Sequence, residues 1–425
     1  MLSKSSWDMS EWKKYSLEDL AFYYNGKAFK PSDWKKDGVK IIRIEQLNNP
    51  EGFYDFYQGE FPDTNKIENG DLIFSWSATL KVLIWKHGDA VLNQHLFKVV
   101  PKQFVDKHFL FFLLDQNMEK IGDTSHGSTM KHIKRGELEK FFVFAPDKTI
   151  QQQIAQILST ADVVIEKTQA AIDKYKAIKQ GMLHDLFTRG IDISTGKLRP
   201  KYEDAPELYK ESRLGWVPKE WKVDKLEYYF DFLRSGLSRL LSDQDIGIPV
   251  LISGNIQDSK LDFSKLKYWY LNDPQGADTN SYVLIEGDIL LCFINSIEQI
   301  GKAAIFEKYN RPCIYTTNLF RVRATQKTKP KFLYYLICSE IVQNEIKAIL
   351  KPAVNQASFT TKDFCKIPVP NISEEEQIHI IRNLEQIDQN IQKEQNYLLK
   401  LQQIKSGLMS DLLSGKKRVT VKEED

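Results

Sequence analysis

Four polar stretches of the chain concentrate the side chains that hydrogen-bond to base edges and to phosphates. Arg, Lys, Asn, Gln, Ser and Thr make most such contacts, and Lys and Arg also neutralise the phosphate backbone. Each half of the chain holds two of these stretches, and the second one in each half precedes a predicted strand. The side chains that could make such contacts, if the chain binds DNA, are Ser75, Ser77, Thr79, Lys81, His126, Ser128, Thr129, Lys131, His132, Lys134 and Arg135 in the first half, and Arg234, Ser235, Ser238, Arg239, Lys351, Asn355, Gln356, Ser358 and Lys362 in the second. The alternative for any one of them is a solvated loop residue without a ligand.

The sequence lacks the residue patterns that commonly carry catalysis. There is no P-loop, no G-x-S-x-G nucleophile elbow and no H-E-x-x-H zinc motif. The Asx-Pro pairs at Asn49 and Asp273 lack the second proline and the aromatic residue of an amino-methyltransferase motif. His126 and His132 stand in one polar loop without a nearby Cys or carboxylate pair, so we predict no metal site. We therefore expect a binding protein with no catalytic residue, metal or cofactor of its own.

The composition is ordinary for a globular protein and does not by itself indicate a ligand. The chain has 425 residues, of which 42% are apolar and 27% charged, and its net charge is only +2. A nucleic-acid surface would therefore have to be a local basic patch. No two of the four cysteines form a C-x-x-C pair, which favours reduced thiols. The first residues lack an apolar signal core, so we expect a cytoplasmic protein.

A segment near residue 150 recurs near residue 375, so the chain is internally duplicated. Gln153-Ile154 resembles Gln377-Ile378, and Lys179-Gln-Gly matches Lys405-Ser-Gly at a sequence offset of 226. Three further matches precede them, at offsets of 209, 217 and 223: Trp12 with Trp221, Gly70-Asp71 with Gly287-Asp288, and Leu96-Phe97 with Leu319-Phe320. The offset grows from 209 to 226 along the chain, and we assign this excess to loops of the second copy. The two Gly-Asp pairs are predicted to form turns, and both tryptophans to lie in cores.

The two repeated segments have the heptad pattern of a coiled coil. Their columns keep one register at the offset of 226, including polar interruptions at Lys179 with Lys405 and at Thr168 with Glu394. At 1.5 Å per residue each helix would be roughly 58 Å long. The residues expected at the helix-pair or partner interface are Leu158, Ile165, Ile172, Tyr175, Leu186, Leu384, Ile387, Ile391, Leu398, Leu401, Leu408 and Leu412. We expect the helices to pair antiparallel; the alternative is that each packs separately on its own domain.

The overall prediction is an α+β protein with a pseudo-two-fold internal repeat, in which two globular domains are joined by two long helices that form an antiparallel coiled coil. Strands are expected at 39–44, 71–76, 82–85, 249–252 and 288–294, and helices at 106–119 and 330–350. The expected division of the chain is a first domain at 1–148, a spacer helix at 149–187, a linker at 188–215, a second domain at 216–372, a second spacer helix at 373–413 and a disordered tail at 414–425.

Several local motifs, in this order and repeated, resemble the specificity subunit of type I restriction–modification enzymes. Leu214-Gly-Trp-Val-Pro-Lys-Glu-Trp221 opens the second half, and the two Gly-Asp pairs precede apolar segments. Ile367-Pro-Val-Pro370 followed by Glu374-Glu-Glu-Gln377-Ile378 is also typical of that family. The first half departs from this pattern, because no acidic residue precedes Gln153.

The resemblance implies a target-recognition function for each globular domain, which would read one half of an asymmetric, bipartite DNA site. It further implies that the helices set the half-site spacing and dock modification subunits, two of them, which carry S-adenosylmethionine and methylate adenine. Restriction subunits would translocate and cut double-stranded DNA, and the chain itself would be non-catalytic. A hypothesis from another class is a two-headed protein–protein adaptor on a coiled-coil strut.

Overall fold

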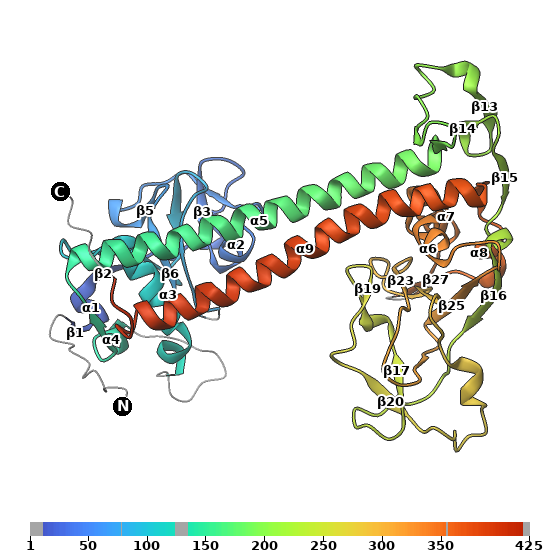
Figure 1. The fold of residues 1–425 in the computed structure, drawn as a ribbon. Helices are drawn as coiled ribbons and strands as arrows, with labels where there is room; N and C mark the ends of the chain where they lie inside the picture. Colours follow the sequence, from blue (N-terminus) through green and yellow to red (C-terminus); the bar gives the residue numbers. More distant parts are fainter. Residues whose placement is uncertain (1–11, 78, 124–134, 354–355, 420–425) are drawn as a thin grey trace, which may run out of the picture. The chain divides into compact units, whose positions relative to one another are not determined.

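The computed structural model describes residues 12–77, 79–123, 135–353 and 356–419, which form two compact units. Unit 1 comprises Met1–Ala170 and Gln395–Asp425, and unit 2 comprises Ala171–Glu394. The helices α5 (Lys148–Thr188) and α9 (Glu374–Leu412) each contribute one half to either unit, and in each unit the two halves lie side by side (Figure 1). Because the N-terminal half of one helix pairs with the C-terminal half of the other, the pairing is antiparallel, as predicted.

Unit 1 contains two four-stranded sheets and a two-stranded ribbon. In the first sheet every neighbouring pair is antiparallel, whereas the second has one parallel pair, β3 with β8. In spatial order the strands are β2 (Ala21–Asn25), β9 (Leu96–Pro101), β6 (Leu72–Ser75) and β7 (Lys81–Ile84); β4 (Phe56–Tyr57), β3 (Val39–Ile42), β8 (Ala90–Leu92) and β5 (Lys66–Ile67); and β1 (Lys13–Ser16) with β10 (Phe142–Ala145). The helices besides α5 and α9 are α1 (Leu17–Leu20), α2 (Ile44–Asn48), α3 (Lys107–Asp123) and α4 (Arg135–Leu138).

Unit 2 repeats this plan with additional small strands. Its sheets, in spatial order, are β16 (Phe230–Ser235), β25 (Leu319–Ala324), β21 (Ile289–Cys292) and β23 (Ala303–Ile305); β20 (Lys267–Trp269), β17 (Ile248–Leu251) and β24 (Ile314–Tyr315); β22 (Ile294–Asn295), β27 (Gln356–Ser358) and β26 (Lys351–Ala353); and the pairs β15 (Lys222–Lys225) with β28 (Pro368–Asn371), β18 (Ile256–Gln257) with β19 (Lys260–Leu261), β11 (Ile191–Asp192) with β12 (Lys197–Leu198), and β13 (Tyr209–Ser212) with β14 (Gly215–Pro218). The helices are α6 (Pro330–Cys338), α7 (Glu340–Ile349) and α8 (Thr361–Cys365).

Strand registers show that the two domains are copies of one scaffold. Lys13 pairs with Ala145 in unit 1, and Lys222 pairs with Asn371 in unit 2, at the offsets of 209 and 226 that the sequence predicts. The parallel pair of β3 with β8 has its counterpart in β17 with β24. The extra residues of the second copy therefore enter between matched strands, mainly after β17.

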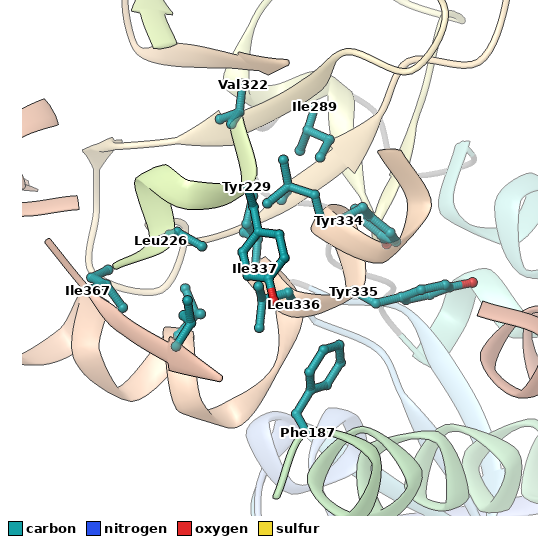
Figure 2. Packing of buried hydrophobic residues seen from close by; sticks show 14 of the residues in the cluster. Phe187, Leu226, Tyr229, Ile289, Val322, Tyr334, Tyr335, Leu336, Ile337 and Ile367 are labelled. Carbon is teal, nitrogen blue, oxygen red and sulfur yellow. The ribbon is translucent and has the colours of Figure 1, made fainter. Parts of the chain in front are cut away.

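The core of unit 2 is built from both long helices and the sheet (Figure 2). Phe187 from the end of α5, Tyr229 before β16 and Leu336 from α6 belong to one buried cluster. The corresponding cluster in unit 1 contains Leu158 of α5 and Leu412 of α9. Each helix is thus anchored in a domain core through apolar residues, which stabilises it far more than its own propensity does. Trp221 is buried as predicted, and Trp12 is partly buried against the core of unit 1.

Five predictions about elements need correction. The predicted strand 39–44 ends at Ile42, and Ile44 begins α2. The predicted strand 288–294 is divided into β21 and β22, and the predicted helix 330–350 is broken at Ser339, which ends α6 and precedes α7. The linker prediction understated its structure: the segment after α5 carries short strands, belongs to unit 2 and contributes Ile191 to the core of that unit. In the predicted tail, Val419 packs against the core of unit 1, and residues 420–425 lie outside the described residues.

Candidate nucleic-acid interface

The Gly-Asp pairs form equivalent turns that start β6 and β21. Gly70 and Gly287 have φ angles of +91° and +92°, which favour glycine. The carboxylate of Asp71 accepts a hydrogen bond from the backbone N–H of Glu68 at 2.8 Å, and that of Asp288 accepts one from Ile285 at 2.9 Å. These residues are turn formers, as predicted.

A second pair of glycines lies where the loops after β2 and β16 leave the sheets. A Cβ added to Gly26 would lie 2.2 Å from the carbonyl oxygen of Asn93, and one added to Gly236 would lie 2.1 Å from that of Tyr315. Both residues follow equivalent strands, β2 and β16, so backbone can cross backbone there only because the side chain is absent. The loop after each crossing differs in length and sequence between the domains.

The first predicted cluster of the first half is only partly exposed. Ser75 and Ser77 are buried, and the hydroxyl of Ser75 donates to the carbonyl oxygen of Ser77. Their position at the end of β6 faces the protein interior, so we withdraw both as base-reading residues. The Lys81 ammonium donates to the carbonyl oxygen of Leu47 at 2.6 Å, whereas Thr79 is exposed.

The second cluster of the first half cannot be placed. His126, Ser128, Thr129, Lys131, His132 and Lys134 lie outside the described residues. Arg135 begins α4, and only its backbone is described.

In the second half, β16 and the loop after it present three different environments. Arg234 is exposed, stacks over the ring of Tyr282 at 4.3 Å and donates to its hydroxyl at 3.0 Å. Ser235 is half-buried and Ser238 is exposed. Arg239 is held by Asp273, with Nε and Nη2 at 3.0 and 2.6 Å from Oδ2.

The ion pair of Arg239 with Asp273 fixes the loop rather than leaving a free cation. The hydrogen bonds from Arg239, from Gln275 and from Ala277 lower the pKa of Asp273 to about 2 despite the opposing effect of burial. Because its guanidinium is committed to this carboxylate, Arg239 is a loop anchor, and Arg234 and Ser238 are the better candidates for contact with DNA.

The last cluster surrounds the hairpin of β26 and β27. Gln356 and Lys362 are exposed, and Ser358 is half-buried in β27. The ammonium of Lys351 lies 3.2 Å from the carboxylate of Asp363. Asn355 lies outside the described residues. The hairpin thus presents a polar, partly basic edge.

The predicted interface residues of the long helices all face the packed side. Among the twelve, Leu158, Ile172, Leu186, Leu384, Ile387, Ile391 and Leu412 are buried, and Ile165, Tyr175, Leu398, Leu401 and Leu408 are half-buried. Leu186 and Leu384 belong to the core of unit 2, and Leu158 and Leu412 to that of unit 1. The ends of the columns therefore also join a domain core, which the heptad pattern alone did not predict.

Sequence reasoning missed the glutamines that anchor the helices to their domains. Gln151 accepts from the backbone N–H of Asp106 at 2.8 Å and donates to the carbonyl oxygen of Pro146. Gln377 accepts from Lys329 at 3.3 Å and donates to Ile372 in the same way. The counterpart of Gln377 is therefore Gln151 and not Gln153. The offset of 226, which fits the rest of the helices, contained this signal.

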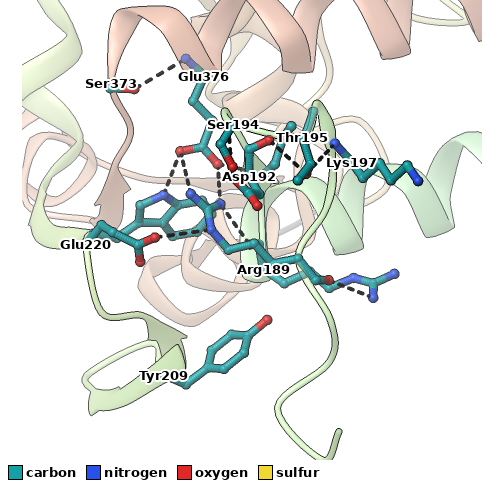
Figure 3. A network of polar contacts seen from close by, with 12 residues as sticks. Arg189, Asp192, Ser194, Thr195, Lys197, Tyr209, Glu220, Ser373 and Glu376 are labelled. Atoms are coloured by element: carbon teal, nitrogen blue, oxygen red, sulfur yellow. Dashed lines mark hydrogen bonds and ion pairs between the residues drawn. The ribbon is translucent and has the colours of Figure 1, made fainter. Parts of the chain in front are cut away.

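A buried polar network joins the start of α9 to the linker (Figure 3). Glu376 accepts from Arg199 at 2.6 Å, from the indole N–H of Trp221 at 2.9 Å and from the backbone of Ile191 at 2.7 Å. A Cβ on Gly190 would lie 2.2 Å from this carboxylate, so glycine is required there. The acidic motif noted in the sequence thus has a structural role.

Nothing in the described part of the chain resembles a metal centre or a membrane span. No group of three or more His, Cys, Asp or Glu side chains in it could hold a metal ion. None of its helices is both long and apolar enough to cross a bilayer. The four thiols are unpaired, and burial raises the pKa of Cys313 to about 12.

Comparison with known protein families identifies the family to which this duplicated arrangement belongs. The model of the type I restriction modification DNA specificity domain matches the chain twice, over residues 9–174 and 216–403. The chain belongs to this family. Each match covers one globular domain and most of the helix that follows it. Because the chain is a member of the specificity family with two DNA-recognition domains, the hypothesis of a protein–protein adaptor is not favoured.

Curated relatives carry the same family name. The MjaVIII specificity subunit of Methanocaldococcus jannaschii is 25% identical over 96% of this chain and 93% of its own length, and the EcoBI specificity subunit of Escherichia coli is 25% identical over 88% and 79%. A putative MjaX specificity subunit from M. jannaschii is 35% identical, but over only 49% of either chain.

Solved structures of the family have the same fold. The S subunit from M. genitalium aligns over 97% of both chains with a TM-score of 0.54 and 15% identity. A chain from a structure of type I system assembly and conformational transition aligns over 96% of this chain and 98% of its own length, with a TM-score of 0.53 and 15% identity. The duplicated α+β architecture with paired long helices is thus the fold of the specificity family.

Proposed function

We propose that the chain is the non-catalytic sequence-recognition subunit of a type I restriction–modification complex and that each domain reads one half of a bipartite DNA site. The observation that carries this proposal is the double occurrence of the DNA specificity domain, once in each half of the chain. Two copies of one scaffold offer two separate reading surfaces, one in each unit.

The unequal loops of the two copies support an asymmetric site. The scaffold strands pair in equivalent registers, but the second domain carries extra residues between them, as the growth of the offset from 209 to 226 requires. Base contacts come from side chains presented in the grooves, so different loops read different sequences. The proposed reading residues in the described loops are Thr79, Arg234, Ser238, Lys351, Gln356 and Lys362.

We assign to the paired helices the spacing of the half-sites and the docking of modification subunits. Because the chain is an internal repeat, it would bind two such subunits, one at each copy. Those partners would bind S-adenosylmethionine and methylate adenine, and restriction subunits would translocate and cut the DNA. Such a complex acts where the chromosome lies, which in a prokaryote is the cytoplasm. The absence of catalytic sequence motifs in this chain is consistent with that division of labour.

Salt dependence of DNA binding tests the proposal directly. A protein that contacts several phosphates loses affinity with a slope of about −0.9 per phosphate in a plot of log K against log salt. Binding of the full chain with its modification subunit to duplex DNA is therefore expected to weaken steeply between low and physiological salt. Absence of DNA binding at low salt would overturn the proposal in favour of a protein adaptor.

A further inference from the structure

Two lysine–aspartate ion pairs occupy equivalent places in the two units. The ammonium of Lys179 in α5 lies 2.6 Å from Oδ1 of Asp388 in α9, and that of Lys405 in α9 lies 2.5 Å from Oδ1 of Asp162 in α5. The two lysines are related by the repeat offset of 226, and so are the two aspartates. The internal repeat has therefore duplicated both partners, and each pair joins one helix to the other.

The surroundings of the two pairs are similar, although the carboxylate of Asp115 also lies near the pair in unit 1. The Lys179 ammonium lies 5.5 Å from the ring centre of Tyr335 in α6, and the Lys405 ammonium lies 5.4 Å from that of Phe112 in α3. The lysine side chains are only 16% and 20% exposed. In unit 2 the Tyr335 hydroxyl also donates to Asp388 at 2.8 Å. These are packed sites, in contrast to flexible surface ion pairs.

The lysines stand in an apolar heptad column, where they interrupt the series Leu158, Ile165, Ile172 and Leu186 and its copy in α9. An apolar column with a heptad repeat is preserved when one helix slides by one heptad. Apolar packing along the columns therefore does not by itself distinguish these registers, and the ion pairs act together with the contacts that the helix ends make in the two domain cores. A polar residue in such a column costs stability but specifies register.

Sliding by one heptad in either direction separates each of the four residues from its present partner. The lysines would then face Gln395 and Gln169, or Ile381 and Ala155. The aspartates would face Leu186 and Leu412, or Ile172 and Leu398. The two lysine ammonium groups, which are mostly buried, would lose these counter-charges, and this disfavours both slipped registers.

We infer that the pairs Lys179–Asp388 and Lys405–Asp162 are positioning contacts that fix the antiparallel register of α5 against α9 and delimit the part of the helices that measures the gap between half-sites. The part of this inference that concerns the gap between half-sites rests on the proposed function. The two locking positions have the same sequence separation on each helix, from Asp162 to Lys179 and from Asp388 to Lys405. At about 1.5 Å per residue that segment is about 26 Å, or about 7–8 base pairs at about 3.4 Å each.

A variant without the locks tests the inference in the complete complex. K179L, K405L, D162N and D388N together fill the apolar columns, and the amide introduced by D388N still offers an acceptor to Tyr335. The control is K174L with K400L, because these lysines are also related by the offset of 226 but are exposed. Each chain is expressed with its modification subunit in a methylation-free host, and modified adenines are mapped.

The wild type and the control are expected to modify one gap length. The lock-free variant, with helix content and cooperative unfolding retained, is expected to modify a second class of sites whose gap differs by about 10 Å, or about three base pairs. The variant K179R with K405R, which keeps both aspartates and both positive charges, is expected to modify a single gap length, as the wild type does. A lock-free variant that modifies only the original gap overturns the inference.

Chemical cross-linking separates failure of the inference from failure of the proposed function. If the wild type directs no modification of a split motif, the proposed function fails, and the register is read in the full chain with a short bismaleimide. The cysteine pair D162C with K405C is expected to cross-link, because these positions face each other in the native register. The pair D162C with L398C is expected not to cross-link in the otherwise unchanged chain. When K179L and D388N are added to D162C with L398C, the slipped register is expected to bring these two cysteines together and produce a cross-link. An unchanged pattern would show that the pairs do not hold the register.

Discussion

Arg199 and Glu376 form a buried ion pair, with Nη1 2.6 Å from Oε1 and side-chain exposures of only 7% and 3%. Arg199 belongs to the segment after α5, and Glu376 to the first turn of α9. Through Trp221 the same carboxylate also holds the start of the second domain. One glutamate thus joins the linker, the domain and the helix of unit 2, so the segment between the repeats is an integral part of that unit.

Replacement of Glu376 by alanine is expected to destabilise unit 2 by about 3 kcal/mol, because it leaves the buried Arg199 guanidinium with only the exposed Glu220, 3.5 Å away, as a counter-charge. Urea unfolding of the purified chain measures the loss. The control is Glu375→Ala, one residue earlier on the exposed face of α9. Equal unfolding midpoints for the two variants would contradict the role of the network.

Gln151→Ala and Gln377→Ala are each expected to cost about 1–3 kcal/mol, because each leaves a backbone N–H without its acceptor. Gln152→Ala, on the exposed side of α5, is expected to cost little. Similar losses at Gln151 and Gln377 in urea unfolding would support their equivalence. A larger loss for Gln153→Ala than for Gln151→Ala would speak for the alternative alignment.

Replacement of the two glycines at the backbone crossings is expected to destabilise the fold even when the new side chain is a single methyl group. Gly26→Ala and Gly236→Ala should each destabilise the chain by about 1–3 kcal/mol, because the added Cβ has no room. Gly181→Ala and Gly407→Ala add the same atom in open space on the long helices and should stabilise by about 0.5–1 kcal/mol. Thermal unfolding of the four variants checks both signs.

Acid sensitivity of the loop after β16 follows from the lowered pKa of Asp273. A carboxylate whose folded pKa, about 2, is below its unfolded value of 3.8 stabilises the fold above that unfolded value, and the contribution is lost as pH falls toward 2. The difference in urea midpoint between the wild type and Asp273→Asn should therefore be constant above about pH 5 and shrink below about pH 4. A difference independent of pH would contradict the ionised pair.

Contact with DNA through Arg234 is expected to affect only one half-site. Arg234→Ala should relax or weaken recognition of the half-site read by the second domain, at about 1–3 kcal/mol for a base contact, and leave the other half unchanged. The matched control is Arg213→Ala, an exposed arginine of the linker. Equal effects on both half-sites in competition binding would exclude a local base contact.

The parts of the fold that follow from local patterns could be predicted from the sequence. The heptad repeats of α5 and α9 are local sequence patterns, and the repeat offsets follow from matching short motifs. The observed ends of both helices lie within one residue of the predicted ends. Breaks such as that at Ser339 depend on how two helices pack on the core, and the amphipathic pattern runs through them.

The candidate site was less predictable, because the accessibility of a polar side chain is a tertiary property. Ser75 and Ser77 have suitable chemistry, but the end of β6 turns them inward. Arg239 has the right charge, but Asp273, 34 residues away, holds it. Arg199 and Glu376 are separated by 177 residues, and no local pattern joins them.

The most direct test of the central claim is a map of modified adenines in the DNA of a methylation-free host that expresses this chain with its modification subunit. The account predicts a single split motif, with two different half-sites separated by a constant gap, that is absent when this chain is omitted. A continuous palindromic motif, or a map that does not depend on the chain, would contradict it.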